Sequence, residues 1–190
     1  MEMKTLLITG FMPFGGDSRN PSWEAVDLLP ASVGGWRIEK RLLPVEFGRA
    51  AALAIREAEA VHADAILCVG LAAGRTAVTP ELVGINLREA PIPDNAGVQP
   101  QNEPIEKDGP AAYFSTLPVR EMTQAIRNAG IPAVLSYSAG AYVCNDLLYT
   151  LLHRYRNSGT RAAFIHVPLE NETFTLSVLS RALCAAIEAI

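Results

Sequence analysis

The chain has 190 residues, a formal net charge of −4 and a composition that is 49% hydrophobic. This length suffices for one domain with a substantial buried core, so we expect a single α/β domain spanning residues 1–190. A net negative charge gives no electrostatic reason to bind phosphate backbones, and we expect no nucleic acid partner.

Apolar runs and cysteines also exclude several classes of protein. No window approaches the roughly 18 apolar residues that a membrane-spanning helix needs, and the first apolar run is too short for a signal peptide. The three cysteines, at positions 68, 144 and 184, form no CxxC pair and have no histidine at metal-ligand spacing. We therefore expect a cytoplasmic protein without membrane contact, disulfide framework, metal or cofactor.

Short apolar runs alternate with amphipathic segments along the chain. The predicted strands are 5–9, 37–43, 65–69, 133–137 and 162–167, and the predicted helices are 22–29, 48–60, 119–128, 141–155 and 175–189. This alternation predicts an α/β fold, namely a three-layer α/β/α sandwich whose mostly parallel, open twisted sheet carries helices on both faces.

The segment 70–118 interrupts the alternation. It is rich in Pro, Gly, Asn and Asp, and it includes the run Pro91-Ile-Pro-Asp-Asn-Ala-Gly97. Long excursions of this kind in compact domains are commonly functional loops, which is how we interpret this one.

Cys144 lies where a small-residue loop, Ser138-Ala-Gly-Ala, leads into the predicted helix 141–155. Free N–H groups and the positive end of the helix dipole favour a thiolate, so we expect a lowered thiol pKa and a reactive cysteine. The alternative is a buried structural cysteine, because free cysteine is among the most buried residue types. Cys68, inside a strand, and Cys184, inside the last helix, are interpreted as structural.

Ligands in open α/β sheets bind beyond the carboxyl ends of the strands, which provides a test for the three histidines. His62 precedes the strand 65–69 and is expected at the opposite edge. His153 lies roughly 13 Å along the helix from Cys144, at 1.5 Å per residue. His166 ends the strand 162–167 and emerges at the edge where Cys144 is expected, so it is the predicted base.

A cysteine–histidine pair generally needs a third group that orients the imidazole, and carboxylates often serve. Glu81 is the favoured candidate, with a surface glutamate at the start of a strand as the alternative. Other carboxylates expected beyond a strand's carboxyl end are Asp17, Asp94 and Asp146.

The loop 10–16 follows the first strand but has the spacing of neither a dinucleotide fingerprint nor a P-loop. Phe11 and Phe14 offer two aromatic rings at the same edge as Cys144. They suit a small, flat ligand with apolar faces, although ordinary core packing explains two phenylalanines equally well.

Four motifs carry a resemblance to a known family that extends over nearly the whole chain. In chain order they are Gly10-Phe-x-Pro-Phe, Val78-Thr-Pro-Glu81, Ile92-Pro-Asp-Asn95 and Ser138-Ala-Gly-x-Tyr-Val-Cys144-Asn. The chain resembles the pyroglutamyl peptidase I family, also called pyrrolidone-carboxylate peptidases. This resemblance implies a cysteine peptidase that removes an N-terminal pyroglutamyl residue from peptides. It assigns Cys144 as nucleophile, His166 as general base and acid, and Glu81 as the group that orients the histidine.

The resemblance also implies an α/β/α sandwich that assembles into a homo-oligomer, a tetramer or a dimer. The substrate-binding positions that it implies are Phe11, Phe14, Asn20, Ile92, Tyr142 and Val143.

Three positions depart from the commonest bacterial pattern of this family. Leu71 stands where glutamine is frequent, Leu82 where a basic residue often follows the glutamate, and Pro91 where many members have arginine. Loss of that arginine leaves oxyanion stabilisation to backbone N–H groups around Cys144, or to Arg75 or Arg88. The departures also motivate an alternative function, a catalytically weak homologue that binds a lactam-type ligand without turnover.

Overall fold

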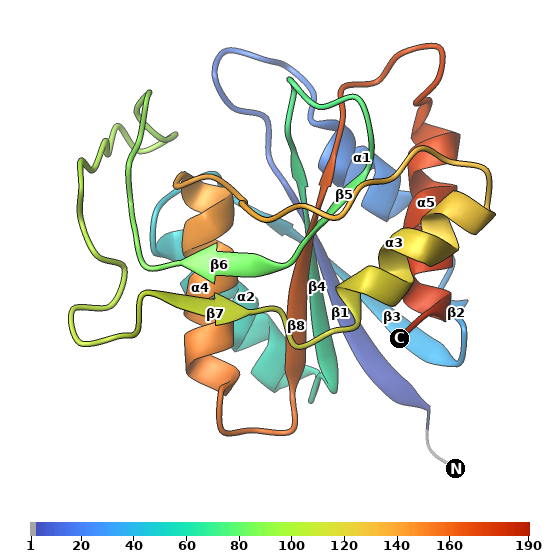
Figure 1. Cartoon of the computed structure of the whole chain (residues 1–190), viewed down its shortest axis with the longest axis horizontal. Coiled ribbons are helices and arrows are strands. Elements are labelled where there is room, and N and C mark those ends of the chain that lie inside the picture. The colour runs from blue at the N-terminus through green and yellow to red at the C-terminus, as the bar shows by residue number, and fades with distance from the viewer. Residues whose placement is uncertain (1–2) are drawn as a thin grey trace.

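The computed structural model describes residues 3–190, in which strands and helices alternate along most of the chain (Figure 1). The strands are β1 Lys4–Phe11, β2 Ser32–Val33, β3 Trp36–Leu43, β4 Ala65–Leu71, β5 Thr79–Glu81, β6 Val83–Ile85, β7 Ala112–Phe114 and β8 Arg161–Val167. The helices are α1 Pro21–Asp27, α2 Arg49–Ala60, α3 Val119–Asn128, α4 Val143–Tyr155 and α5 Leu176–Glu188. Within these residues no helix has the length and apolarity to span a membrane.

The main sheet has six strands in the order β2-β3-β1-β4-β8-β5. Strands β3, β1, β4 and β8 are parallel, while the short edge strands β2 and β5 run antiparallel to their neighbours. Helices α2 and α4 cover one face, and α1, α3 and α5 cover the other (Figure 1). The predicted three-layer α/β/α sandwich is confirmed.

Two apolar clusters, one on each face of the sheet, form the core. Along β1, Leu6 and Ile8 join the cluster under α1, α3 and α5, whereas Leu7 joins the cluster under α2 and α4. All three side chains are fully buried. Burial on both faces explains why the central strands are almost continuously hydrophobic instead of alternating.

The predicted strand 133–137 is wrong. This segment forms only isolated bridges, Ala133 with Val78 and Ser136 with Glu81, as it runs parallel to β5. Pro80, in the middle of β5, has no N–H to donate, so a continuous ladder along this edge cannot form.

The excursion 70–118 is more ordered than a loop, because it contains β5 and the two-stranded sheet of β6 and β7. Strands β5, β6 and β7 have three residues each, which is too short to show a hydrophobic period, so the sequence did not predict them. Asn145 of α4 fixes this small sheet: its Oδ1 accepts from the Ile85 N–H at 2.9 Å, and its Nδ2 donates to the carbonyls of Ile85 and Leu87. The residue after Cys144 therefore anchors the excursion to the helix.

Candidate active site

Cys144 and His166 lie together at the carboxyl end of the parallel strands. His166 is near the end of β8 and pairs in register with Gly70 of β4. Cys144 is the second residue of α4, and its Sγ lies 2.9 Å from the point that a Cβ on Gly70 would occupy. The sulfur therefore rests against the backbone of the strand next to His166.

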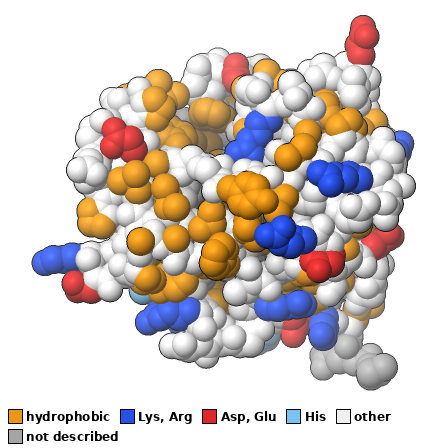
Figure 2. Space-filling view, in the orientation of Figure 1, with side chains coloured by type: hydrophobic (Ala, Val, Ile, Leu, Met, Phe, Trp, Pro, Cys, Tyr) orange, Lys and Arg blue, Asp and Glu red, His pale blue; other side chains and the backbone are white. Residues whose placement is uncertain are grey.

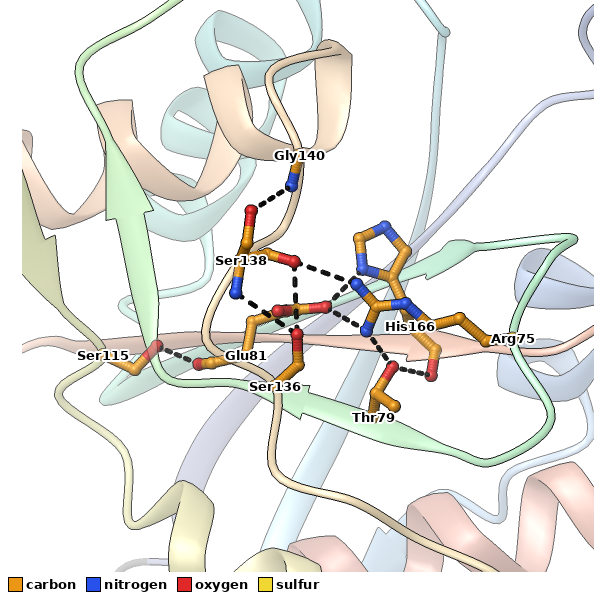
Figure 3. Close-up of polar contacts among 8 residues, drawn as sticks. All are labelled: Arg75, Thr79, Glu81, Ser115, Ser136, Ser138, Gly140 and His166. Atoms are coloured by element: carbon orange, nitrogen blue, oxygen red, sulfur yellow. Dashed lines mark hydrogen bonds and ion pairs between the residues drawn. The ribbon is translucent and has the colours of Figure 1, made fainter.

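His166 is held by a buried carboxylate. Its Nδ1 lies 2.7 Å from Oε1 of Glu81, and both side chains are almost completely inaccessible to solvent. The contact arises because β5 runs antiparallel to β8. Donation from Nδ1–H to Glu81 leaves the second ring nitrogen, Nε2, free to accept a proton, and Figure 3 shows that this nitrogen points away from Glu81.

Arg75 completes the polar network in Figure 3. Its guanidinium lies 2.6 Å from the same Oε1 of Glu81, donates to the Ser138 carbonyl at 2.9 Å and also bonds the Thr79 hydroxyl. Ser138 belongs to the loop that leads to Cys144. Arg75 therefore joins the segment after β4, strand β5 and the loop before Cys144.

The pKa shifts of Cys144 and His166 favour the neutral form of each side chain. Burial, reinforced by the negative charge of Glu81, raises the pKa of Cys144 to about 12. Burial also lowers the pKa of His166, although Glu81 opposes this shift. The predicted lowering of the thiol pKa is therefore wrong, because loss of hydration outweighs the stabilisation of a thiolate by Arg75 and the backbone N–H.

Within residues 3–190, Cys144 Sγ makes no hydrogen bond to His166. Catalytic hydrogen bonds are often long in empty sites and shorten only in complexes with substrate.

A small, mainly apolar cavity opens beside the thiol. Its lining residues are Phe11, Phe14, Asn20, Val45, Leu71, Tyr142 and Cys144. The rings of Phe14 and Tyr142 lie 6.4 Å apart, and Phe47 packs edge-on against Tyr142 at 5.3 Å. Such walls suit a flat ring with apolar faces.

The positions expected to bind substrate fall into two groups. Phe11, Phe14, Asn20 and Tyr142 line the cavity, but Asn20 accepts from Ser22 N–H as the cap of α1 and donates to the Met12 carbonyl. Its amide therefore positions the loop.

Two expected positions do not line the cavity. Val143 is fully buried in the core cluster under α4, and the exposed Ile92 has 44% of its surface accessible. Val45 was missed by the sequence analysis, because it lies in a loop with no motif that marks it.

The other two histidines and Arg88 do not join this network, and His62 lies near the start of a strand, as the strand-end test predicts. His62 is exposed near the start of β4, and His153 is bonded to the Tyr113 hydroxyl at 3.0 Å. Arg88 lies 2.6 Å from the buried Asp146. Of the two arginines considered for the oxyanion, only Arg75 is bonded to Glu81, and its charge acts on the Cys144 thiol.

Comparison with known proteins identifies the family of this chain. The family model for pyroglutamyl peptidase matches residues 3–187. A pyrrolidone-carboxylate peptidase from Chromobacterium violaceum is 49% identical over 167 residues, 87% of this chain and 78% of that protein. The chain belongs to the pyroglutamyl peptidase family.

Further relatives extend over nearly the whole chain. A pyrrolidone-carboxylate peptidase from Levilactobacillus brevis is 44% identical over 97% of this chain and 96% of its own. The crystal structure of pyroglutamyl peptidase I from Bacillus amyloliquefaciens superposes with a TM-score of 0.94 at 42% identity, covering 99% of this chain and 95% of that chain. The pyrrolidone carboxyl peptidase of Thermococcus litoralis gives a TM-score of 0.93 at 37% identity, covering 98% and 93%.

The three departures from the common pattern of the pyroglutamyl peptidase family occupy different environments. Leu71 lines the cavity, so an apolar side chain stands at this position of its wall. Leu82 packs partly buried against the core, and Pro91 is exposed. In the described part of the chain, no group of three or more His, Cys, Asp or Glu side chains is placed to hold a metal ion.

Gly70→Ala should impair both turnover and stability. The added Cβ would lie 2.9 Å from Cys144 Sγ and 2.7 Å from the ring of the fully buried Phe164, so the sulfur and this ring must both shift. We expect kcat/KM to fall by about tenfold or more, since small displacements of reacting groups are costly. Steady-state kinetics and thermal unfolding measure the two effects, and wild-type kinetics in the variant would contradict this placement of the sulfur.

Arg75→Met should move the acid limb of the kcat/KM profile to higher pH. The positive charge of Arg75 lowers the pKa of His166, so its removal raises that pKa, and the neutral base is then lost at a higher pH as the solution is acidified. Loss of a charge-assisted bond to a buried carboxylate should also reduce kcat/KM by about tenfold or more.

Arg75→Lys is the matched control. It keeps the positive charge and should leave the acid limb near its wild-type position. An unchanged limb in both variants would show that Arg75 has no electrostatic effect on His166.

Proposed function

We propose that this protein hydrolyses the amide bond after an N-terminal pyroglutamyl residue of peptides, through a thioester on Cys144. The observation that carries the proposal is the buried Glu81–His166 hydrogen bond of 2.7 Å, formed at the sheet edge where Cys144 borders an apolar cavity. The names and high coverage of its relatives support the same activity.

The reaction follows from the positions of these groups. Sγ of Cys144 attacks the pyroglutamyl carbonyl carbon as the thiol proton passes to Nε2 of His166, and the imidazolium then protonates the departing amine. A thioester remains on Cys144. Water gives a proton to His166 and attacks this thioester, which releases pyroglutamate and returns the proton to sulfur.

The start of α4 provides the oxyanion site in this proposal. Tyr142, the N-cap residue, forms no side-chain hydrogen bond to the first turn. The N–H groups at this end are therefore available to a developing oxyanion beside Cys144. Backbone donors of this kind support catalysis despite the proline at position 91.

Three further proposals concern the setting of the enzyme. We propose one catalytic domain over 1–190, supported within 3–190 by core clusters on both faces of one sheet; residues 1 and 2 lie outside the described part. We propose a cytoplasmic location, where a reducing environment keeps a catalytic thiol reduced. The proposed partners are peptides with N-terminal pyroglutamate.

A fluorogenic pyroglutamyl amide tests the activity. Fresh, reduced wild type should release the fluorophore, and Cys144→Ala should be inactive because the nucleophile is absent. Glu81→Gln should lower kcat by about a hundredfold or more, the usual scale of general acid–base catalysis, while far-ultraviolet circular dichroism stays unchanged. If concentrated wild type bound pyroglutamate but cleaved nothing, the non-catalytic lactam-binding alternative would replace this proposal.

We also propose that the protein forms a homo-oligomer, a tetramer or a dimer. The face shown in Figure 2 gathers hydrophobic side chains over the region of β6 and β7. Large apolar side chains that are exposed include Phe114 of β7, at 70%, and Tyr137 and Val134 of the segment between α3 and α4, at 66% and 52%. Exposed apolar groups of this size favour burial against another surface.

Light scattering after size exclusion tests the assembly. The wild type should elute with the mass of a dimer or a tetramer, and Phe114→Lys should shift the population towards monomer. A monomeric wild type at micromolar concentration would contradict the proposal.

A further inference from the structure

The sequence Pro93-Asp94-Asn95 belongs to the motif Ile92-Pro-Asp-Asn95, yet it contributes nothing to the network of Glu81 and His166. Its hydrogen bonds lead elsewhere. They reach three segments that are distant in sequence and that each contribute walls of the cavity: the loop after β1, the loop after β3 and the start of α4.

Each of these contacts ends at or beside a lining residue. The Tyr142 hydroxyl donates to the Pro93 carbonyl at 3.0 Å, and Asn95 N–H donates to the Val45 carbonyl at 3.0 Å. Asn95 Nδ2 donates to the carbonyl of Pro13 at 2.9 Å, one residue before Phe14. One short segment thus bonds to, or next to, three of the residues that line the cavity.

Asp94 makes the segment rigid. Its buried carboxylate accepts from the N–H groups of Ala96 and Val98 through Oδ1, which closes the turn. Oδ2 accepts from Phe47 N–H at 2.8 Å, and Phe47 packs edge-on against Tyr142. The same side chain therefore folds its own loop and fixes the ring that supports a cavity wall.

We propose that Pro93, Asp94 and Asn95 act as positioning residues that set the width of the cavity and thereby its affinity for the pyroglutamyl ring. The inference rests on the proposed function for the identity of the bound group. When the hydrogen bonds between separate segments are removed, the cavity walls that these segments form lose their alignment. A wider cavity makes fewer van der Waals contacts with a flat ring and therefore binds it more weakly.

The expected kinetic signature is a change in KM with little change in kcat. Within residues 3–190, no hydrogen bond joins Pro93, Asp94 or Asn95 to Cys144, His166 or Glu81. Variants should therefore weaken binding of the acyl group, while the acid limb of the pH profile stays at its wild-type position.

Asn95→Ala and Asp94→Asn test the proposal with the fluorogenic pyroglutamyl amide. Asn95→Ala removes one bond and should raise KM by about three- to tenfold, the range of one net hydrogen bond. Asp94→Asn replaces one carboxylate oxygen, which accepts from a backbone N–H, with an NH₂ group that can only donate. It should therefore raise KM more than Asn95→Ala does. Gln101→Ala is the matched control, because within residues 3–190 the Gln101 side chain bonds only the Ala90 carbonyl, to which Gln99 also donates.

Amide hydrogen exchange gives a second readout that needs no activity. Peptides covering 11–16 should exchange faster in Asn95→Ala, and those covering 43–48 should exchange faster in Asp94→Asn, relative to wild type and Gln101→Ala. If the wild type cleaves nothing, the proposed function fails. The hydrogen-exchange rates alone then test whether Pro93, Asp94 and Asn95 position the cavity walls. Unchanged exchange, or a fall in kcat with KM unchanged, would overturn the proposal.

Discussion

One carboxylate oxygen, Oε1 of Glu81, accepts hydrogen bonds from both His166 and Arg75, and the geometry of the site depends on it. These bonds join β5 to β8, and through Arg75 to the loop before Cys144. Within residues 3–190 the other oxygen, Oε2, is buried without a partner, so the two bonds at Oε1 must compensate for burying this charge. Removing either partner therefore affects the histidine, the nucleophile's loop and the edge of the sheet together.

Burial gives the site its electrostatic character. It raises the pKa of the thiol and lowers that of the imidazole, so neither reacting group is favoured in its charged form before substrate enters. In the proposed reaction, charge develops during attack beside the positive end of α4 and the guanidinium of Arg75. The proposed nucleophile, Cys144, depends on a correctly oriented base, and the Glu81–His166 bond holds the imidazole in one orientation.

Chemistry and shape are maintained by separate polar networks. The first comprises Arg75, Glu81 and His166, and the second links Asp94 and Asn95 to the loops that form the cavity walls. Both lie at the carboxyl edge of the sheet, where loops from distant parts of the sequence meet. This separation explains how an apolar Leu71 in the cavity and an exposed Pro91 are compatible with an intact catalytic arrangement.

The sequence by itself determined the layers and the polarity of the site. Hydrophobic periodicity predicted every helix and the parallel strands, because those signals are local. The end of the 162–167 run placed His166 at the same edge of the sheet as Cys144. Only the tertiary structure decided the rest. The partners of Arg75, the exclusion of Val143 and Ile92 from the cavity, and the raised thiol pKa each depend on which distant groups surround a side chain. Burial is a property of the packed molecule, so the sequence marked Cys144 at the start of α4 as a candidate nucleophile but could not predict the charge state of its thiol.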